Sequence, residues 1–294
     1  GLEYASMELN DLSNYEKAEE ICRRQVLDYH INDADGILLL GDIFLEWGTE
    51  KDPAKLESAR EQYATLIQLY RSNMLYEGRM MRYFIRTDNL PEVLTLKEYF
   101  LPKEKNLPPE DWTELSGYML DKLYGPLAPS DEYLRNYIED VKLLLTRAYK
   151  LDSQNPVAAY NLSRYFIETN ESTAAKSTLI DTLDKFKKSS QLKRRDLYKY
   201  IDTYRLAGEE YAKAQEFLRA QEHDTDGITL YTADRGASGL QGNVKIGQLF
   251  ADQADMDYFI TGDYDNALQN YISSVELEND SPSIRYKIGY IQYK

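Results

Sequence analysis

A short segment near the C-terminus constrains the fold of this chain more than any other feature. Gly262 opens a turn, and the apolar helical pattern after it carries Tyr264, then Ala267, then Tyr271. Pro282 opens a further apolar helix. The start of this helix lies one repeat, roughly 34 residues, after the start of the helix that precedes the turn. A small residue between two aromatic residues at helical spacing marks a place where two helices approach closely. The segment therefore predicts a sharp turn and an amphipathic helix that packs closely against a neighbouring helix.

Imperfect copies of this pattern recur along nearly the whole chain. The first helix of one pair carries Leu40, Gly41 and Phe44, and its second helix carries Ala59 and Tyr63. Further copies contain Tyr15, Ala18 and Cys22; Met80, Met81 and Phe84, with Leu90 and Val93; Trp112, Leu115 and Ser116; Pro156, Ala159, Leu162 and Phe166, with Ala175 and Leu179; and Leu197, Tyr200 and Tyr204, with Gly208, Tyr211, Ala214 and Leu218. The pattern resembles the tetratricopeptide (TPR) repeat. This resemblance spans residues 1–294 with one gap, and it implies an all-α fold, a right-handed α-solenoid of about seven TPR-like helix pairs.

The gap in the pattern lies at residues 223–242. Four glycines fall there, at Gly227, Gly236, Gly239 and Gly242, without helical periodicity. We predict a Gly-rich inserted loop at 223–242, because clustered glycines disfavour regular structure. The expected organisation is one continuous solenoid, with TPR-like repeats at 1–222, the insert, and a final repeat with the start of another at 243–294. The first and last helices lack the polar caps of a solenoid end, so we expect either a piece of a longer protein or a chain whose end packs on another molecule.

Charge and composition exclude several classes of partner. The formal net charge is −15, which disfavours nucleic acid and anionic membrane surfaces, since both require a basic footprint. No apolar stretch is long enough for a membrane-spanning helix, so direct membrane insertion is not expected. The single Cys22 excludes an internal disulfide and fits a buried core thiol. The 26 tyrosines against 8 phenylalanines exceed what the repeat positions need, and exposed tyrosine is a frequent interface residue.

The sequence offers little for catalysis. His30 and His223 lie far apart and have no metal-ligand spacing around them. The glycines near Ser238 match neither a nucleophile elbow nor a phosphate-binding loop. We therefore expect no enzyme activity, no catalytic residue, no cofactor and no metal.

The resemblance implies where partners would bind. In the TPR family the first helices of the pairs line a concave face, and the register places cationic, amide and aromatic side chains on it: Arg79, Arg82, Arg86, Asn161, Arg164, Arg195, Tyr198, Lys199, Arg205, Tyr286 and Tyr290. Arginine and tyrosine suit a peptide that carries carboxylates. In the alternative interpretation, these cations balance neighbouring acids of the same chain.

The leading functional hypothesis is a protein–protein interaction scaffold that organises a multiprotein assembly, with other proteins or peptides as partners. More narrowly, the Tyr-rich and acid-rich repeats are similar to bacterial TPR proteins, in particular spirochaete periplasmic TPR proteins of the flagellar collar type. That likeness implies a role in the flagellar motor and motility, with collar and stator proteins as partners. It also favours the bacterial periplasm, with the cytoplasm as the alternative. The competing hypothesis is a ligand- or peptide-binding TPR accessory protein in which the 223–242 insert closes over the concave groove.

Overall fold

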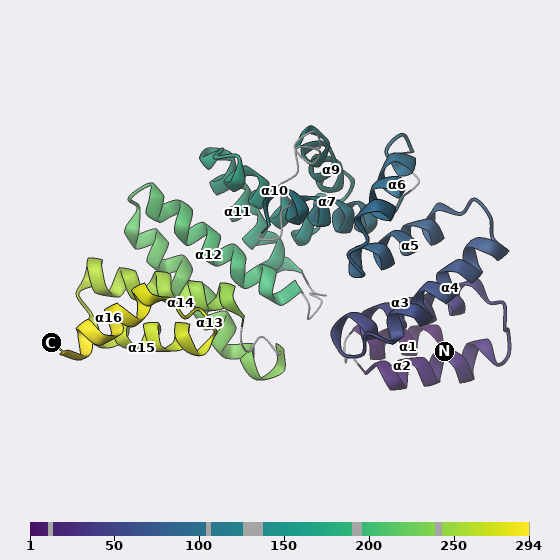
Figure 1. Cartoon of the computed structure of the whole chain (residues 1–294), viewed down its shortest axis with the longest axis horizontal. Helices are drawn as coiled ribbons and strands as arrows, with labels where there is room; N and C mark the ends of the chain where they lie inside the picture. The colour runs from purple at the N-terminus through teal and green to yellow at the C-terminus, as the bar shows by residue number, and fades with distance from the viewer. Residues whose placement is uncertain (11–13, 104–106, 126–137, 190–195, 239–242, 294) are drawn as a thin grey trace. The chain divides into compact units, whose positions relative to one another are not determined.

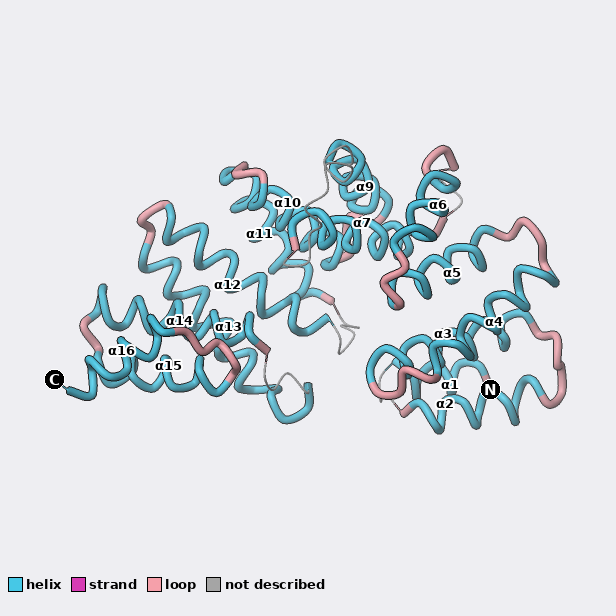
Figure 2. The backbone as a smooth tube through the Cα atoms, viewed as in Figure 1, coloured by secondary structure: helices cyan, strands magenta, loops and turns pink. Residues whose placement is uncertain are grey.

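The computed structural model describes residues 1–10, 14–103, 107–125, 138–189, 196–238 and 243–293. Throughout these ranges the regular structure is helical and contains no strand, which confirms the predicted all-α fold (Figures 1 and 2). The chain divides into two compact units, residues 1–152 and residues 153–294. The continuity of the solenoid between the two units stays a prediction.

The first unit is built from consecutive helix pairs. Helices α1 (Leu2–Asn10) and α2 (Tyr15–Cys22) form the first pair, and α2 continues into a π-helical turn, η1 (Arg23–Leu27). The pairs that follow are α3 (Ala34–Glu50) with α4 (Lys55–Leu69), α5 (Met74–Arg86) with α6 (Leu90–Phe100), and α7 (Pro109–Tyr124) with α9 (Ile138–Leu151). The first helix of each pair also contacts the first helix of the next, as α3 does with α5 and α5 with α7.

The second unit repeats this arrangement. It pairs α10 (Pro156–Glu168) with α11 (Ser172–Lys188), α12 (Leu197–Lys213) with α13 (Phe217–Ser238), and α14 (Val244–Met256) with α15 (Tyr264–Glu276). A π-helical turn, η3 (Asp257–Thr261), extends α14, and α16 (Pro282–Tyr293) packs on α15. None of the described helices is both long enough and apolar enough to cross a membrane.

Side-chain caps define where the first helices of several pairs begin. Asp33 precedes α3, and its carboxylate accepts a hydrogen bond from the Gly36 amide at 2.7 Å. Asn73, Asn155 and Asn243 cap α5, α10 and α14 in the same way. Such a cap satisfies amide donors that the helix leaves unpaired, and it typically stabilises the helix by about 1 kcal/mol. The turn residues of the repeat therefore fix the start of each of these helices.

Small residues allow the helices of a pair to pack closely. The small residue of the second helix is fully buried in four pairs: Ala18, Ala59, Ala175 and Ala267. A Cβ atom on Gly41 of α3 would lie 2.6 Å from the ring of Tyr63 on α4, so only glycine fits at this crossing. These contacts confirm the repeat register for the pairs that contain them.

The inserted loop predicted at 223–242 is wrong for residues 223–238, which continue α13; residues 239–242 lie outside the described part. Helix α12 runs to Lys213, so the second helix of this pair begins at Phe217 rather than near Gly208. The glycines provide close contact here. A Cβ atom on Gly208 would lie 2.2 Å from Asp224 Oδ1, and one on Gly227 would lie 2.9 Å from Leu249. Glycine is tolerated in a helix where a neighbouring group comes this close.

Candidate interaction surfaces

The arginines predicted to line the groove of the first unit form ion pairs within the chain. Arg82 on α5 is only 7% exposed and contacts Asp111 on α7, and its Nη2 atom lies 3.2 Å from Glu110 Oε2. Arg79 bridges two helices, with Asp111 at 3.0 Å and Asp42 of α3 at 3.2 Å. Burial opposes the charge of Arg82, but the carboxylates, Asp111 foremost, outweigh it and hold the pKa of Arg82 above its ordinary value. We call these residues the Asp111 network.

A second network, centred on Asp202 of α12, joins first helices of the second unit. Arg205 Nε donates to Asp202 Oδ1 at 2.8 Å, and Lys245 of α14 donates to Asp202 Oδ2 at 3.0 Å. The Tyr160 hydroxyl of α10 also donates to Asp202 Oδ2, at 2.7 Å. Burial raises the pKa of Asp202, but Arg205 and then Lys245 outweigh burial and lower the pKa to about 2. The carboxylate is therefore ionised across the ordinary pH range, and it ties α10, α12 and α14 together.

The remaining predicted groove residues occupy several environments. Arg86 pairs with Glu114 at 3.0 Å, and Lys199 pairs with Asp196 at 2.6 Å. Asn161 is buried, the guanidinium of Arg164 lies 5.6 Å from the centre of the Tyr160 ring, and Lys199 lies 5.5 Å from that of Tyr198. Arg195 lies outside the described residues. The ion pairs of Arg79, Arg82, Arg86 and Arg205 match the alternative interpretation, in which cations balance acids of the same chain. That the set binds a partner stays a prediction.

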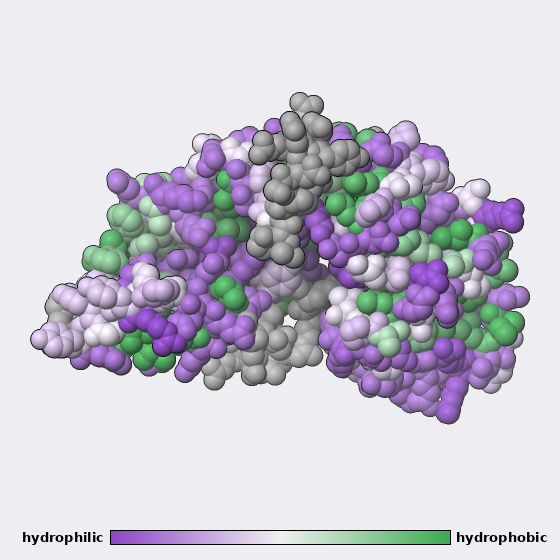
Figure 3. Space-filling model, in the orientation of Figure 1, coloured by the Kyte–Doolittle hydropathy of each residue, from purple (hydrophilic) through white to green (hydrophobic). Residues whose placement is uncertain are grey.

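The two predicted tyrosines of α16 lie at an exposed aromatic surface. Tyr286 is 72% exposed and Tyr290 is 38% exposed, and their rings stack with centroids 6.3 Å apart. Tyr258 and Phe259 on η3 extend this surface; Phe259 is 64% exposed, and the Tyr258 ring lies 6.4 Å from that of Tyr290. We call these four residues the η3–α16 aromatic surface. Figure 3 shows that hydrophilic residues cover most of the face drawn, and apolar residues form separate small groups.

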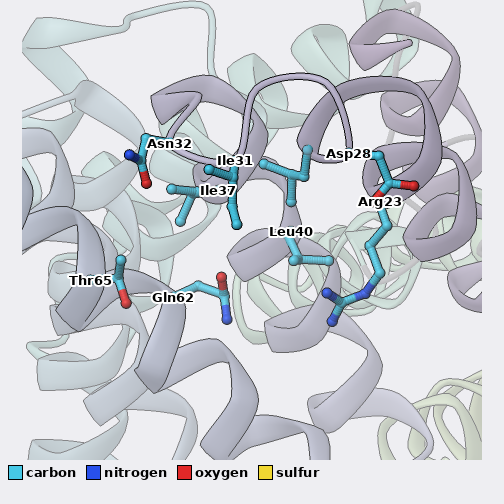
Figure 4. Close-up of a pocket in the computed structure, with 9 residues that line it drawn as sticks. Arg23, Asp28, Ile31, Asn32, Ile37, Leu40, Gln62 and Thr65 are labelled. Carbon is cyan, nitrogen blue, oxygen red and sulfur yellow. The ribbon is translucent and has the colours of Figure 1, made fainter.

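Sequence reasoning missed a pocket in the first unit, between η1, the turn before α3, and α4. Its cavity volume is about 360 Å³. Its lining includes Ile37 and Leu40, which are buried, and Asn32 and Gln62, which carry amides (Figure 4). The repeat register predicts binding residues only on the first helices of the pairs, whereas Gln62 belongs to a second helix. The signal that could have revealed the pocket is Ile31, an apolar residue in an otherwise polar turn.

Clusters of metal-ligating side chains are not found among the described residues: no group of three or more His, Cys, Asp or Glu side chains could hold a metal ion there. Cys22 is buried and donates from its thiol to the Gly36 carbonyl at 3.3 Å. Burial raises the pKa of this thiol to about 11. Cys22 is therefore a core thiol, as the sequence predicts.

Comparisons with known proteins agree with this geometry. The TPR repeat family model matches residues 257–294. The fold is similar to the APC/C hetero-tetramer Cut9–Hcn1, with a TM-score of 0.59 and 13% identity over 93% of this chain and 45% of that chain. It is also similar to the human IFIT1 dimer with PPP-AAAA, with a TM-score of 0.55 and 11% identity over 94% of this chain and 58% of that chain. This chain thus spans about half the length of the solved structures that it matches.

Identities this low show the fold alone. The sequence matches none of the curated proteins compared with it. The family match at 257–294 includes the Ala267 position, whose side chain is fully buried in the structure. The TPR repeat match at residues 257–294 agrees with the stacked helix pairs, and the similar solved structures agree with the fold.

Proposed function

We propose that this chain is a protein-interaction scaffold that presents an aromatic docking surface on η3 and α16. The observation that carries the proposal is the η3–α16 aromatic surface on a TPR-like solenoid. Large exposed aromatic side chains are enriched at protein interfaces, because they bury much area and lose little conformational entropy. The similar structure of Cut9–Hcn1 is that of a hetero-tetramer, which agrees with a role in assembly.

Site-specific photo-cross-linking in the source organism tests this proposal. A photoreactive amino acid replaces Tyr286, and in a matched control it replaces Lys188, a 71% exposed residue of α11. We expect the same discrete protein adducts in repeated experiments from position 286 and none of those adducts from position 188. Identical adduct patterns at both positions would mean that the aromatic surface has no partner of its own, which contradicts the proposal.

A narrower proposal concerns the assembly itself. The similarity to spirochaete periplasmic TPR proteins of the flagellar collar type supports a place in a bacterial motor collar, beside stator proteins. Its only support is the Tyr-rich and acid-rich sequence. A fluorescent fusion and a gene deletion test it: the proposal requires foci at the flagellar motors and a loss of motility. A diffuse fusion in fully motile deletion cells contradicts it.

The competing hypothesis of an accessory protein with a closing insert loses its basis. Residues 223–238 form a helix that packs on α12 and on α14, so this part of the proposed lid is structural. The pocket of the first unit supports peptide binding at a different site, outside the 223–242 segment.

A further inference from the structure

We infer that the pocket between η1 and α4 binds an extended peptide and accepts one branched or linear aliphatic side chain from it. We call this site the η1–α4 pocket. The inference deepens the proposed scaffold function, on which it rests, by naming the class of partner and a second binding site. That site lies in the first unit, separate from the η3–α16 aromatic surface.

The floor of the pocket is apolar. Leu40 and Ile37 of α3 form its base but are only 1% and 4% exposed, so the apolar surface that a ligand can reach comes mainly from the partly buried Leu27 of η1 and the exposed Ile31. The volume of about 360 Å³ lies at the small end of the range for ligand sites, roughly 300–1,000 Å³. A site of this size accommodates a short segment of chain rather than a large cofactor. Burying an aliphatic side chain against Leu27 and Ile31 is favourable, since it removes apolar surface of the ligand and of these residues from water.

Two side-chain amides stand on opposite borders of the pocket. Asn32 lies in the turn before α3 and Gln62 lies on α4, and Figure 4 shows Ile37 and Asn32 along one border with Thr65 and Gln62 facing them. Within the described part of the chain, neither amide takes part in a hydrogen bond with another protein group. A primary amide carries both donors and an acceptor, and so does each peptide unit. The pair is therefore suited to an extended main chain that runs between them.

The charges at the rim are mixed. Arg23 and Asp28 both line the pocket, and Arg23 Nε already donates to Glu19 Oε1 at 2.8 Å. A phosphate ligand would meet the carboxylate of Asp28, and an ammonium ligand would meet the guanidinium of Arg23. A neutral peptide main chain avoids both conflicts, which is why we favour a peptide over a charged small molecule.

The rim is also apolar and held in place. Ile31 is 79% exposed at the edge of the pocket. The turn that carries it is tied to the end of α4, because the Tyr70 hydroxyl donates to the Asn32 carbonyl oxygen at 3.0 Å. A rim fixed in this way costs less conformational entropy on binding than a free loop. Ile31 can therefore cover a bound aliphatic side chain from the solvent side.

The test uses the full chain and five acetylated, amidated Ser-Gly-X-Gly-Ser peptides, in which X is Leu, Ile, Val, Met or Ala. Methyl and side-chain amide NMR spectra report binding. We expect the aliphatic peptides to shift the methyl signals of Ile37 and Leu40 and the amide signals of Gln62, with dissociation constants in the millimolar range. The Ala peptide should bind at least about tenfold more weakly, because it fills little of the cavity.

A matched pair of variants supplies the control. Thr65 and Thr95 are both exposed and lie on second helices, and the hydroxyl of each donates to the carbonyl four residues before it, at 2.8 and 3.0 Å. Only Thr65 lines the pocket. Thr65→Trp should fill the opening and abolish the methyl shifts, whereas Thr95→Trp should leave them unchanged.

Three results would overturn the inference: no shift with any of the aliphatic peptides, equal binding of the Ala peptide, or equal loss in both tryptophan variants. Failure here is distinguishable from failure of the scaffold proposal. The photo-cross-links at Tyr286 report a surface of the other unit and do not depend on the η1–α4 pocket. Cross-links without peptide binding would leave the scaffold standing and remove only the pocket as a site.

Discussion

Replacing Asp224 with asparagine should flatten the pH dependence of stability in the second unit. Asp224 lies on α13 and is 1% exposed, and its Oδ1 atom has no hydrogen-bond partner in the described structure. Asp252 of α14 also has an unpartnered, buried carboxylate oxygen, Oδ2. Burial is the largest cause that raises the pKa of Asp224, and the charge of Asp252 is the next; together they bring it to about 8. The charge of Arg205 lowers this pKa, and the charge of Glu209 raises it further. Burial and then Glu209 likewise raise the pKa of Asp252 to about 7.

The direction of the effect follows from proton binding. An unfolded aspartate has a pKa of about 3.9, so between about pH 5 and pH 7 the folded state holds about one more proton at Asp224 than the unfolded chain does. The stability that this proton supports is complete below the unfolded pKa and is lost as the pH rises through the folded pKa. Each pH unit then lowers the free energy of unfolding by about 1.4 kcal/mol, or about 3 kcal/mol over this interval. Asparagine is neutral throughout and removes this contribution.

Urea denaturation of the full chain at several pH values, followed by circular dichroism, measures the slope. Hydrogen-exchange mass spectrometry of the α13 and α14 peptides assigns the change to the second unit. The control is Asp226→Asn, which removes an exposed carboxylate two residues further along the same helix. We expect Asp224→Asn to become more stable relative to the parent protein as the pH rises. The free energy of unfolding of Asp226→Asn should show the same pH dependence as that of the parent protein. Equal slopes for Asp224→Asn and the parent protein would refute the reasoning.

Three further predictions concern packing and charge. Ala267→Leu should lower the melting temperature, because the fully buried Ala267 packs with Ala254 and Tyr271. Overpacking at such a site costs about 1–3 kcal/mol of stability. An unchanged melting curve would mean that the repeat register is wrong. Arg82→Ala should lower the free energy of unfolding, measured by urea denaturation, by about 3–5 kcal/mol, because the fully buried Asp111 loses a partner. A loss below about 1 kcal/mol would contradict a structural role for the pair. Tyr286→Ser should change stability by no more than about 0.5 kcal/mol, since the ring is 72% exposed; a larger loss by thermal denaturation would show that the ring supports the fold.

The helix pairs could be predicted because their packing depends on residues close in sequence. Ala59 and Tyr63 are four residues apart on one helix, and Gly41 meets Tyr63 within the same repeat. Such constraints recur at a fixed period, so imperfect copies reinforce each other. The prediction of an inserted loop was wrong for the opposite reason, because it depended on contacts between residues of different helices. Gly227 looks like a loop signal in sequence, and only its contact with Leu249 on the neighbouring helix reveals its role.

The charges of the predicted groove depend on residues from different repeats. Arg82 and Asp111 are 29 residues apart, and Asp202 and Lys245 are 43 residues apart. Each pair joins first helices of neighbouring repeats, so no single repeat contains both partners. The nearest acids of Arg205 and Lys199 lie three or four residues away in sequence, whereas the partners of Arg79, Arg82 and Arg86 lie on other helices and could be identified only after those helices were stacked. The η1–α4 pocket was missed because its walls come from second helices and a turn.

The magnitudes of these interactions decide where recognition can occur on this chain. Separating a buried arginine from its carboxylate costs about 3–5 kcal/mol, whereas a charge-assisted hydrogen bond to a partner contributes about 1.5–3 kcal/mol. Arg82 and Arg205 are 7% and 8% exposed in such pairs, so exchanging their own carboxylates for those of a partner is unfavourable. The η1–α4 pocket and the η3–α16 aromatic surface require no such exchange, because the Gln62 amide has no hydrogen-bond partner among the described residues and the Tyr286 ring already faces water. Acidic residues between the first helices thus hold the repeats together, which is why we propose the η1–α4 pocket and the η3–α16 aromatic surface, rather than these paired arginines, as binding sites.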